Sequence, residues 1–304
     1  MIFFIEKMEQ QLKTLKYPNL INAPMTMSSK SPIMFVIEDI RKVLNPSSSS
    51  KNISSKAAVS SKKGASKKKH HHINKKSESC LEMFKKSCFG TLFSMKKIRF
   101  NSSITHHLLL RQVMCSDLQV MEFNFNGKGA RFTKQEFGLI TGLNCKSVSP
   151  NGPCPKSDRI LNTYFNGNRR LKNSHIKHAF LNTTEFEEEN DLLKLGLLYF
   201  LECGILGKDS EKFIDIEHLS MVDNLDYFNS YPWGITSYNM TIHSLHKAFR
   251  HRDGATNTSN TYSLSGFPLA FQVFLSTCFN IYHLVNVYFH QFQPYDDIIY
   301  WCYN

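Results

Sequence analysis

The chain has 304 residues, and its hydrophobic content of 41% is enough to bury the core of one large domain or two small ones. Its eight cysteines are scattered singly with no C-x-x-C pair, which excludes a dense disulfide framework and favours reduced thiols in the cytosol or the nucleus. The formal charge is +12, but nine lysines and no acid lie between Lys51 and Lys76, so the rest of the chain carries 12 − 9 = +3. The positive charge therefore belongs to one segment and does not describe the fold.

The first 46 residues contain two apolar stretches separated by prolines. The first stretch has helical spacing, and the second runs from Ile33 to Leu44. Glu6 follows the amino-terminal apolar residues too closely to leave room for the core of a signal peptide, so we do not expect secretion. We expect residues 1–46 to form a peripheral segment.

Residues 47–79 consist largely of serine and lysine and have almost nothing to bury. Such a composition cannot offset the entropy of ordering a chain, so we expect a disordered linker. Accessible lysine clusters are typical of nuclear localisation signals and of arms that bind phosphate without sequence preference; the plainer alternative is a solvated linker with no receptor. The candidate residues are Lys62, Lys63, Lys67, Lys68, Lys69, Lys75 and Lys76.

The apolar spacing from Ile104 to Met114 predicts a helix with Val113 on its inner side. His106 and His107 lie within it, but adjacent side chains on a helix point about 100° apart, and no cysteines lie at ligand spacing. We expect no metal site here.

The stretch after residue 120 holds the strongest local signals. Apolar and polar residues alternate from Met121 to Phe125, which is the period of a strand with one buried face. Asn126-Gly127 can adopt the positive φ angles of a tight turn, and Ala130-Arg131-Phe132 supplies a returning strand. The sequence therefore predicts a β-hairpin.

A short helix with signals at both ends is predicted directly after the hairpin. Thr133 stands as its N-cap with Glu136 three residues on, which is the spacing of a capping box. Phe132 and Phe137 are placed to form a hydrophobic staple across this cap. Gly142 follows where the helix would end in a left-handed residue.

Proline and glycine make the stretch from Lys146 to Arg170 a loop by composition. Leu171 to Leu181 is a predicted helix, on which His175 and His178 lie three residues apart. Two histidines alone are too few to indicate a metal site, so we interpret the pair as part of a polar helix face.

The next predicted helix, from Leu192 to Leu201, is apolar nearly all round and ends at Gly204. An acidic run from Glu185 to Asp191 precedes it, and acids at a helix start complement the positive end of the dipole, so this run needs no ligand to explain it. A helix with leucines on every face belongs in the middle of a domain. We expect it to be the central buried helix.

Three further elements are expected before residue 253. Asp215 to Val222 predicts a short helix, and Tyr231-Pro232-Trp233-Gly234 is interpreted as a structural corner with the tryptophan as its apolar anchor. The inner face of the amphipathic helix that follows is formed by Tyr238, Ile242, Leu245 and Phe249. Basic residues from His243 to Arg252 complement the negative end of this helix, or alternatively contact phosphate.

The last part of the sequence predicts a short strand from Tyr262 to Gly266 and then a long helix that starts at Pro268. This helix has a polar stripe that includes Gln272, which a lone membrane span would not need. We expect residues 276–304 to be a divergent helical tail and do not expect a membrane segment.

Three stretches carry a resemblance to a known family. The run RFTKQEFGLITGLNC, from Arg131 to Cys145, resembles the core of a plant domain-of-unknown-function family, number nineteen-eighty-five. Tyr231–Gly234 and Leu264–Leu269 agree with it in the family's order. The family resembles a noncatalytic module often found upstream of a ubiquitin-like-protease cysteine peptidase domain in plant proteins derived from Mutator-like transposons.

Cys203 would be the nucleophile if this chain were itself such a peptidase, because Glu202-Cys203-Gly204 is similar to the Asp-Cys-Gly of ubiquitin-like proteases. That resemblance implies a nucleophile at a helix start, whereas Cys203 is expected at a helix end, where the dipole raises the pKa of a thiol. No His-Trp pair lies upstream of it, and no glutamine for an oxyanion hole lies just before it. We interpret it as a packed thiol and expect no catalytic, cofactor-binding or metal-binding residue.

The expected fold is α+β, mainly helical, with a small β-hairpin packed on a helical core, and its globular domain spans residues 80–275. The expected function is a noncatalytic interaction module with an unidentified protein partner and no cofactor. One alternative is a ubiquitin-like-protein (SUMO) cysteine peptidase, by family association, and another is nonspecific DNA binding through residues 51–76. The expected compartment is the nucleus, with the cytoplasm as the alternative.

Overall fold

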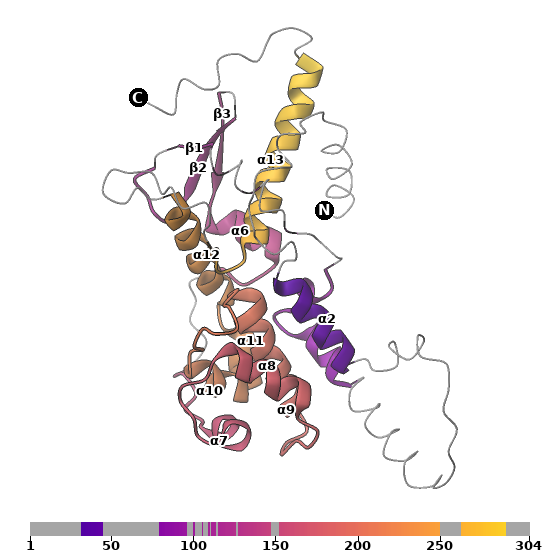
Figure 1. Cartoon of the computed structure of the whole chain (residues 1–304). Helices are drawn as coiled ribbons and strands as arrows, with labels where there is room; N and C mark the ends of the chain where they lie inside the picture. Colours follow the sequence, from indigo (N-terminus) through magenta and orange to yellow (C-terminus); the bar gives the residue numbers. More distant parts are fainter. Residues whose placement is uncertain are drawn as a thin grey trace, which may run out of the picture. The chain divides into compact units, whose positions relative to one another are not determined.

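The computed structural model describes residues 32–44, 79–95, 100, 105, 109, 111–113, 115–125, 127–146, 152–249 and 263–289 (Figure 1). They fall into two compact units. Unit 1 holds the described residues of Ile98–Thr141 and Tyr238–Asn304, and unit 2 those of Lys30–Lys97 and Gly142–Ser237. The predicted lysine candidates all lie outside the described residues.

The sheet of unit 1 confirms the predicted hairpin and adds a strand to it. Strands β2 (Met121–Phe125) and β3 (Lys128–Phe132) are antiparallel with Phe125 opposite Lys128, and Gly127 in the turn has a φ of 82°. Strand β1 (Gln112–Val113) pairs with the other edge of β2. The predicted helix to Met114 is therefore wrong at its carboxyl end, and Val113 is exposed because it lies on an edge strand.

Helix α6 (Lys134–Thr141) follows β3 as predicted, and its first turn is a capping box. Thr133 Oγ1 accepts a hydrogen bond from Gln135 N at 3.1 Å, and Thr133 N donates to Glu136 Oε2 at 2.9 Å. The rings of Phe132 and Phe137 lie 6.5 Å apart, so the predicted staple is also present. Local sequence is sufficient to define this helix start.

An aromatic cluster joins the sheet of unit 1 to its helices. Helix α13 (Pro268–Phe289) begins at the predicted proline, and Figure 1 shows it beside β3 and α6. The ring of Phe132 lies 5.4 Å from that of Phe271 and 5.9 Å from that of Tyr238, which belongs to α12 (Trp233–Phe249). The hairpin is thus packed on helices, as predicted, because its buried face is built from phenylalanines.

Two further expectations concern the carboxyl-terminal part. Residues 263–265 form no strand, so the strand predicted to reach Gly266 is wrong over this described stretch. Within the part of the chain that the structure describes, no helix combines the length and the hydropathy needed to cross a bilayer.

Unit 2 is a group of helices around α9 (Asp191–Tyr199), every residue of which is buried. The predicted central helix is therefore confirmed. It continues as a π-helix, η4 (Phe200–Ile205), beyond the predicted end at Gly204. The helices that surround it are α2 (Pro32–Leu44), a helix over 79–86, α4 (Gly90–Phe93), α7 (Arg159–Phe165), α8 (Asn173–Asn182), α10 (Glu217–Asp223), α11 (Leu225–Ser230) and the first turn of α12.

Helix α7 corrects the prediction that the whole of Lys146–Arg170 is a loop. It has only seven residues, and the prolines and glycines on both sides of it conceal its short apolar pattern. Its C-cap, Asn166, has a φ of 51°, a left-handed conformation that asparagine tolerates at helix ends. Helix α8 agrees with the prediction for Leu171–Leu181 to within two residues.

Helix α2 packs on η4 and supplies part of the unit 2 core. Ile37 and Ile40 of α2 are completely buried, and Asp39 accepts a hydrogen bond from Tyr199 Oη at 3.0 Å. The ring of Phe84, from the helix over 79–86, meets the ring of Phe200 of η4 edge-to-face at 5.5 Å. The chain on both sides of the lysine-rich segment is therefore fixed to unit 2, while the predicted domain boundaries stay predictions.

Candidate functional site

Two of the stretches that carry the family resemblance meet inside unit 2. Gly234 N donates a hydrogen bond of 3.0 Å to Asn144 O. A Cβ atom at Gly234 would lie 2.6 Å from that carbonyl oxygen and 2.5 Å from Cys145 Sγ. The close approach of the two backbones therefore requires glycine at position 234.

Trp233 confirms the interpretation of Tyr231–Gly234 as a structural corner. Its side chain is 1% exposed, and its Nε1 donates to Phe228 O at 2.8 Å. The imidazole of His218, on α10, meets the indole edge-on at 5.1 Å. The corner thus connects α11, α12 and α10 through one large buried ring.

The third stretch, Leu264–Leu269, also contains a glycine that lies close to another backbone, in unit 1. Gly266 has a φ of 78°, and a Cβ atom there would lie 2.5 Å from Thr241 N. Phe267 N donates to Thr241 Oγ1 at 2.7 Å. The close backbone contacts of Gly234 and Gly266 therefore each lie within one unit, the first in unit 2 and the second in unit 1.

A buried carboxylate and imidazole lie beside the tryptophan corner. Glu202 of η4 is 0% exposed and accepts a hydrogen bond from Lys208 Nζ at 2.7 Å. It also forms a hydrogen bond with His218 Nδ1. In a catalytic triad, a carboxylate orients an imidazole, and the imidazole acts as general base toward a nucleophile. Glu202 and His218 correspond to the first two of these groups. Within the described residues, however, the ring of His218 forms hydrogen bonds with Glu202 alone.

Cys203, next to this pair, is a poor nucleophile. Burial raises the pKa of its thiol to about 12, and the charge of Glu202 adds to the effect. The sequence predicted a raised pKa from the dipole at a helix end, but burial is the larger cause. A thiol with this pKa stays protonated at neutral pH, and the thiolate is the reactive form.

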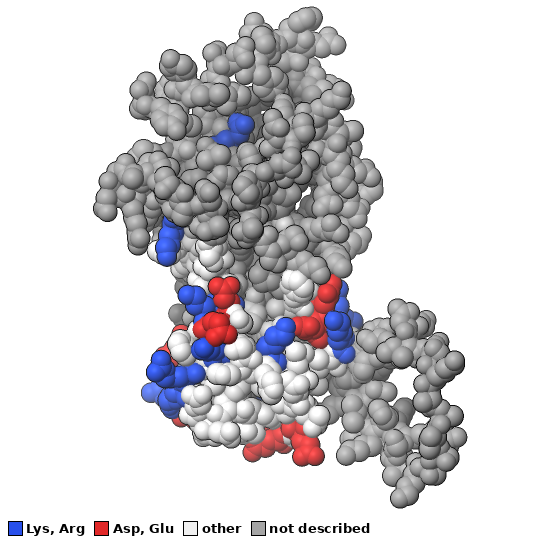
Figure 2. Space-filling view, in the orientation of Figure 1, with Lys and Arg blue, Asp and Glu red and all other residues white. Residues whose placement is uncertain are grey.

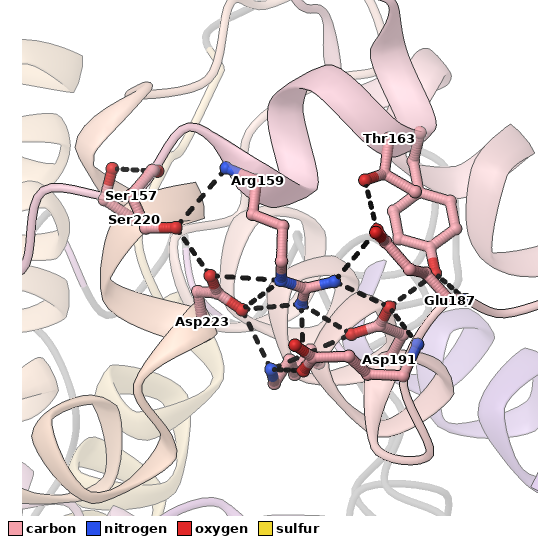
Figure 3. A network of polar contacts seen from close by, with 10 residues as sticks. Ser157, Arg159, Thr163, Glu187, Asp191, Ser220 and Asp223 are labelled. Carbon is pink, nitrogen blue, oxygen red and sulfur yellow. Dashed lines mark hydrogen bonds and ion pairs between the residues drawn. The ribbon is translucent and has the colours of Figure 1, made fainter.

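The densest polar cluster surrounds Arg159 of α7, whose guanidinium lies between two carboxylates in Figure 3. Arg159 Nη2 donates to Asp191 Oδ1 at 2.7 Å and to Asp223 Oδ1 at 2.6 Å. Asp191 is the first residue of α9 and Asp223 is the last residue of α10. One side chain therefore ties three helices together.

Lys194 is the second cation of this Arg159 network, which we define as Arg159, Glu188, Asp191, Lys194 and Asp223. Its Nζ lies 2.8 Å from Glu188 Oε2 and 2.8 Å from Asp223 Oδ1. Neutral hydroxyls complete the cluster, because Tyr164 Oη donates to Asp191 and Ser157 Oγ donates to Asp223. Each buried charge is thereby matched by a partner from another element.

The contacts change how these groups titrate. Burial by itself would raise the pKa of the Asp223 carboxyl, but hydrogen bonds from Arg159, Lys194 and Ser157 outweigh it and hold that pKa well below its usual range. The pKa of Asp191 is lowered in the same way, against burial, by Arg159 and Tyr164. Burial and the bond to Asp191 raise the pKa of Tyr164 to about 12.

Three carboxylates of the network, Glu188, Asp191 and Asp223, have oxygen atoms within 4.8 Å of one another. Such a group could in principle hold a divalent cation with oxygen ligands. The same oxygens already accept hydrogen bonds from Arg159 and Lys194, and a metal ion would lie beside two positive charges. The residues therefore fit an ion-pair network and do not fit a metal site.

This network was not predicted from the sequence. The acidic run before α9 was attributed to the helix dipole, yet Asp191 is 0% exposed and paired with Arg159, 32 residues away. A signal was available, since Asp191 opens a helix that is apolar all round and Lys194 lies within it. Buried charges in such a helix need partners, which the sequence does not locate.

His175 and His178 lie on α8, as expected. Nδ1 of His175 accepts a hydrogen bond from Lys172 N at 3.1 Å and so helps to cap the helix start. No group of three metal-ligating side chains that includes either histidine occurs in the described ranges. Both histidines line a hollow between the end of α7 and one face of α8.

Comparison with known proteins gives one match. No curated protein and no solved structure is significantly similar to the chain. Residues 109–244 match the model of the family described as Domain of unknown function (DUF1985), which confirms the resemblance to family number nineteen-eighty-five. The match includes the stretches Arg131–Cys145 and Tyr231–Gly234, while Leu264–Leu269 lies beyond it. Over residues 109–244 this chain is therefore similar to the DUF1985 family of domains of unknown function.

Proposed function

We propose that the chain is a noncatalytic interaction module that acts in the nucleus and binds a protein partner. The family match gives a domain whose description names no reaction. The proposal therefore depends on what the side chains of the described residues are engaged in.

The observation that carries the proposal is the state of the thiols and charges in the described structure. Burial raises the pKa of Cys88 and Cys203 to about 12 and that of Cys278 to about 11, so these thiols are poorly suited to nucleophilic attack. The charged groups of the Arg159 network are paired with one another across helices. Because these charged groups pair with one another, a structural role for the Arg159 network is favoured over a catalytic one.

The nuclear part of the proposal is supported by composition. Nine lysines without an acid lie between Lys51 and Lys76, and a nuclear import signal needs only accessible lysines. On the face shown in Figure 2, blue and red groups lie beside one another over the middle of the coloured part, and one red group lies by itself at the lower edge. By its composition, the lysine-rich segment is suited to an electrostatic function.

An activity assay tests the noncatalytic part. The full chain and its Cys203→Ala variant are incubated with fluorogenic ubiquitin and SUMO substrates under reducing conditions. We expect neither protein to release the fluorophore above the rate of the buffer blank, because the Cys203 thiol stays protonated. Release by the wild type that Cys203→Ala abolishes would overturn the proposal in favour of a cysteine peptidase.

Localisation of a fluorescent fusion in plant cells tests the nuclear part. We expect the wild-type fusion to accumulate in nuclei and the variant with glutamine at seven positions to lose that accumulation. The positions are Lys62, Lys63, Lys67, Lys68, Lys69, Lys75 and Lys76. A control variant carries glutamine at the exposed residues Lys85 and Lys86. Equal nuclear signal in the seven-position variant and the wild type would contradict the assignment.

A further inference from the structure

Unit 2 has an open hollow of about 390 Å³ that lies between the end of α7 and one face of α8. Its apolar floor is formed by Phe165, Leu171 and Ala179, each of which is at most 8% exposed. A volume of this size falls within the range of small-molecule and short-peptide sites, about 300 to 1,000 Å³.

The rim of the hollow carries hydrogen-bonding groups that the fold leaves unused. Within the described part of the chain, the ring nitrogens of His178 and the side-chain amide of Asn166 form no hydrogen bond. Asn182 donates Nδ2 to His178 O at 2.9 Å and keeps its Oδ1 available. Amides and imidazoles can both donate and accept, so the rim offers both kinds of partner to one ligand.

The chemistry of the lining restricts the ligand. None of the lining residues, all in the described range 164–183, is Asp, Glu, Lys or Arg. A phosphate or carboxylate group would find no opposite charge here, so the site suits an uncharged ligand. This excludes the nucleic-acid backbone as the preferred occupant, because counterion release would supply no affinity at this hollow.

The spacing of the lining residues suits an extended ligand. His175, His178, Ala179, Asn182 and Thr183 follow one face of α8 and its end, a distance of about 12 Å at 1.5 Å per residue. An extended peptide covers this distance with about four residues at 3.3 Å each. Its alternating N–H and C=O groups match a rim that both donates and accepts, and a small apolar side chain can contact Ala179.

We propose that this hollow binds a short, extended and uncharged peptide segment of the partner protein. The inference rests on the proposed function as an interaction module and assigns one surface to it. The occupant is recognised by amide and imidazole contacts to its backbone and by an apolar floor for one side chain.

Peptide display on the full chain tests this inference. Enriched peptides are synthesised with a fluorescein label and titrated by fluorescence anisotropy against the wild type and the His178→Ala/Asn182→Ala double variant. A matched control is Leu181→Ala/Glu185→Ala, which changes two exposed residues outside the lining. Circular dichroism checks that all three proteins are equally folded.

We expect enriched peptides to be uncharged over about four residues, and the double variant to weaken their binding at least about tenfold, which corresponds to about 1.4 kcal/mol. The control is expected to bind within about twofold of the wild type. Failure to enrich any peptide, or equal affinity of the double variant and the wild type, overturns the assignment. Binding of a labelled oligothymidine that the double variant abolishes also overturns it, in favour of single-stranded nucleic acid.

These outcomes separate the two proposals. Peptides that bind elsewhere on the chain would remove the hollow from consideration and leave a noncatalytic interaction module in place. Thiol-dependent turnover of ubiquitin or SUMO substrates would remove the proposed function and leave the peptide measurements unaffected.

Discussion

Asp223 receives hydrogen bonds from three different parts of unit 2. It accepts hydrogen bonds from Arg159, Lys194 and Ser157, which come from α7, α9 and the chain just before α7. Since its pKa in the fold is lowered, the ionised form stabilises the fold. This stabilisation is fully present above the ordinary carboxyl pKa of about 3.9 and is lost as the pH falls through the lowered pKa.

We expect Asp223→Asn to lower the free energy of unfolding at pH 7 by about 1.5 to 3 kcal/mol, the range for hydrogen bonds to charged groups. The difference from the wild type should shrink from about pH 4 downward, because acid protonates Asp223 first in the unfolded chain and then, at lower pH, in the fold. Urea unfolding followed by circular dichroism at a series of pH values measures both effects.

The matched control is Asp226→Asn, an exposed acid on the neighbouring helix α11. It should change the free energy of unfolding by no more than about 0.5 kcal/mol. An Asp223→Asn variant with the same stability as this control at pH 7 would show that the Arg159 network does not stabilise unit 2.

At the scale of the element, helix α6 depends on contacts within its own first turn. Thr133→Ala removes the hydroxyl that accepts from Gln135 N and should cost about 0.5 to 2 kcal/mol, the usual range for an N-cap. Thermal unfolding of the full chain measures the change. Gln135→Ala replaces an exposed side chain in the same turn and serves as control; equal melting temperatures of the two variants would argue against a stabilising cap.

The elements also show which structural features the sequence can specify. The hairpin and α6 were predicted because their signals lie within about twenty residues of one another, from Met121 to Gly142. Strand β1 was missed because it has only two residues, too few to show an alternating pattern, and the apolar spacing from Ile104 predicted a helix over them. The Arg159 network was missed for a different reason, because Arg159 and Asp223 are 64 residues apart and no local pattern links them.

At the scale of the whole molecule, charge and core occupy different parts of the chain. If residues 51–76 bind nucleic acid, the affinity should fall steeply as salt rises, because counterion release is the main contribution that lysines make. We expect deletion of residues 51–76 to abolish binding of a labelled DNA duplex at about 50 mM salt. Electrophoretic mobility shifts at several salt concentrations measure this.

A second deletion provides the reference for that experiment. Removal of residues 290–304 shortens the chain at its other end and leaves all nine lysines in place. This variant should bind the duplex with the salt dependence of the wild type. Binding retained by the variant without residues 51–76 would instead place the nucleic-acid site in the folded part of the chain.

Because α2 packs on η4, the described residues on both sides of the lysine-rich segment belong to unit 2. Leu44 before it and residue 79 after it both belong to unit 2, and α2 contacts η4 through fully buried side chains such as Ile37. The segment is therefore an insertion anchored at both ends, unlike a terminal tail. A protease that cuts once between them should leave α2 bound noncovalently, so the two fragments should elute together in native gel filtration and separate only in denaturant.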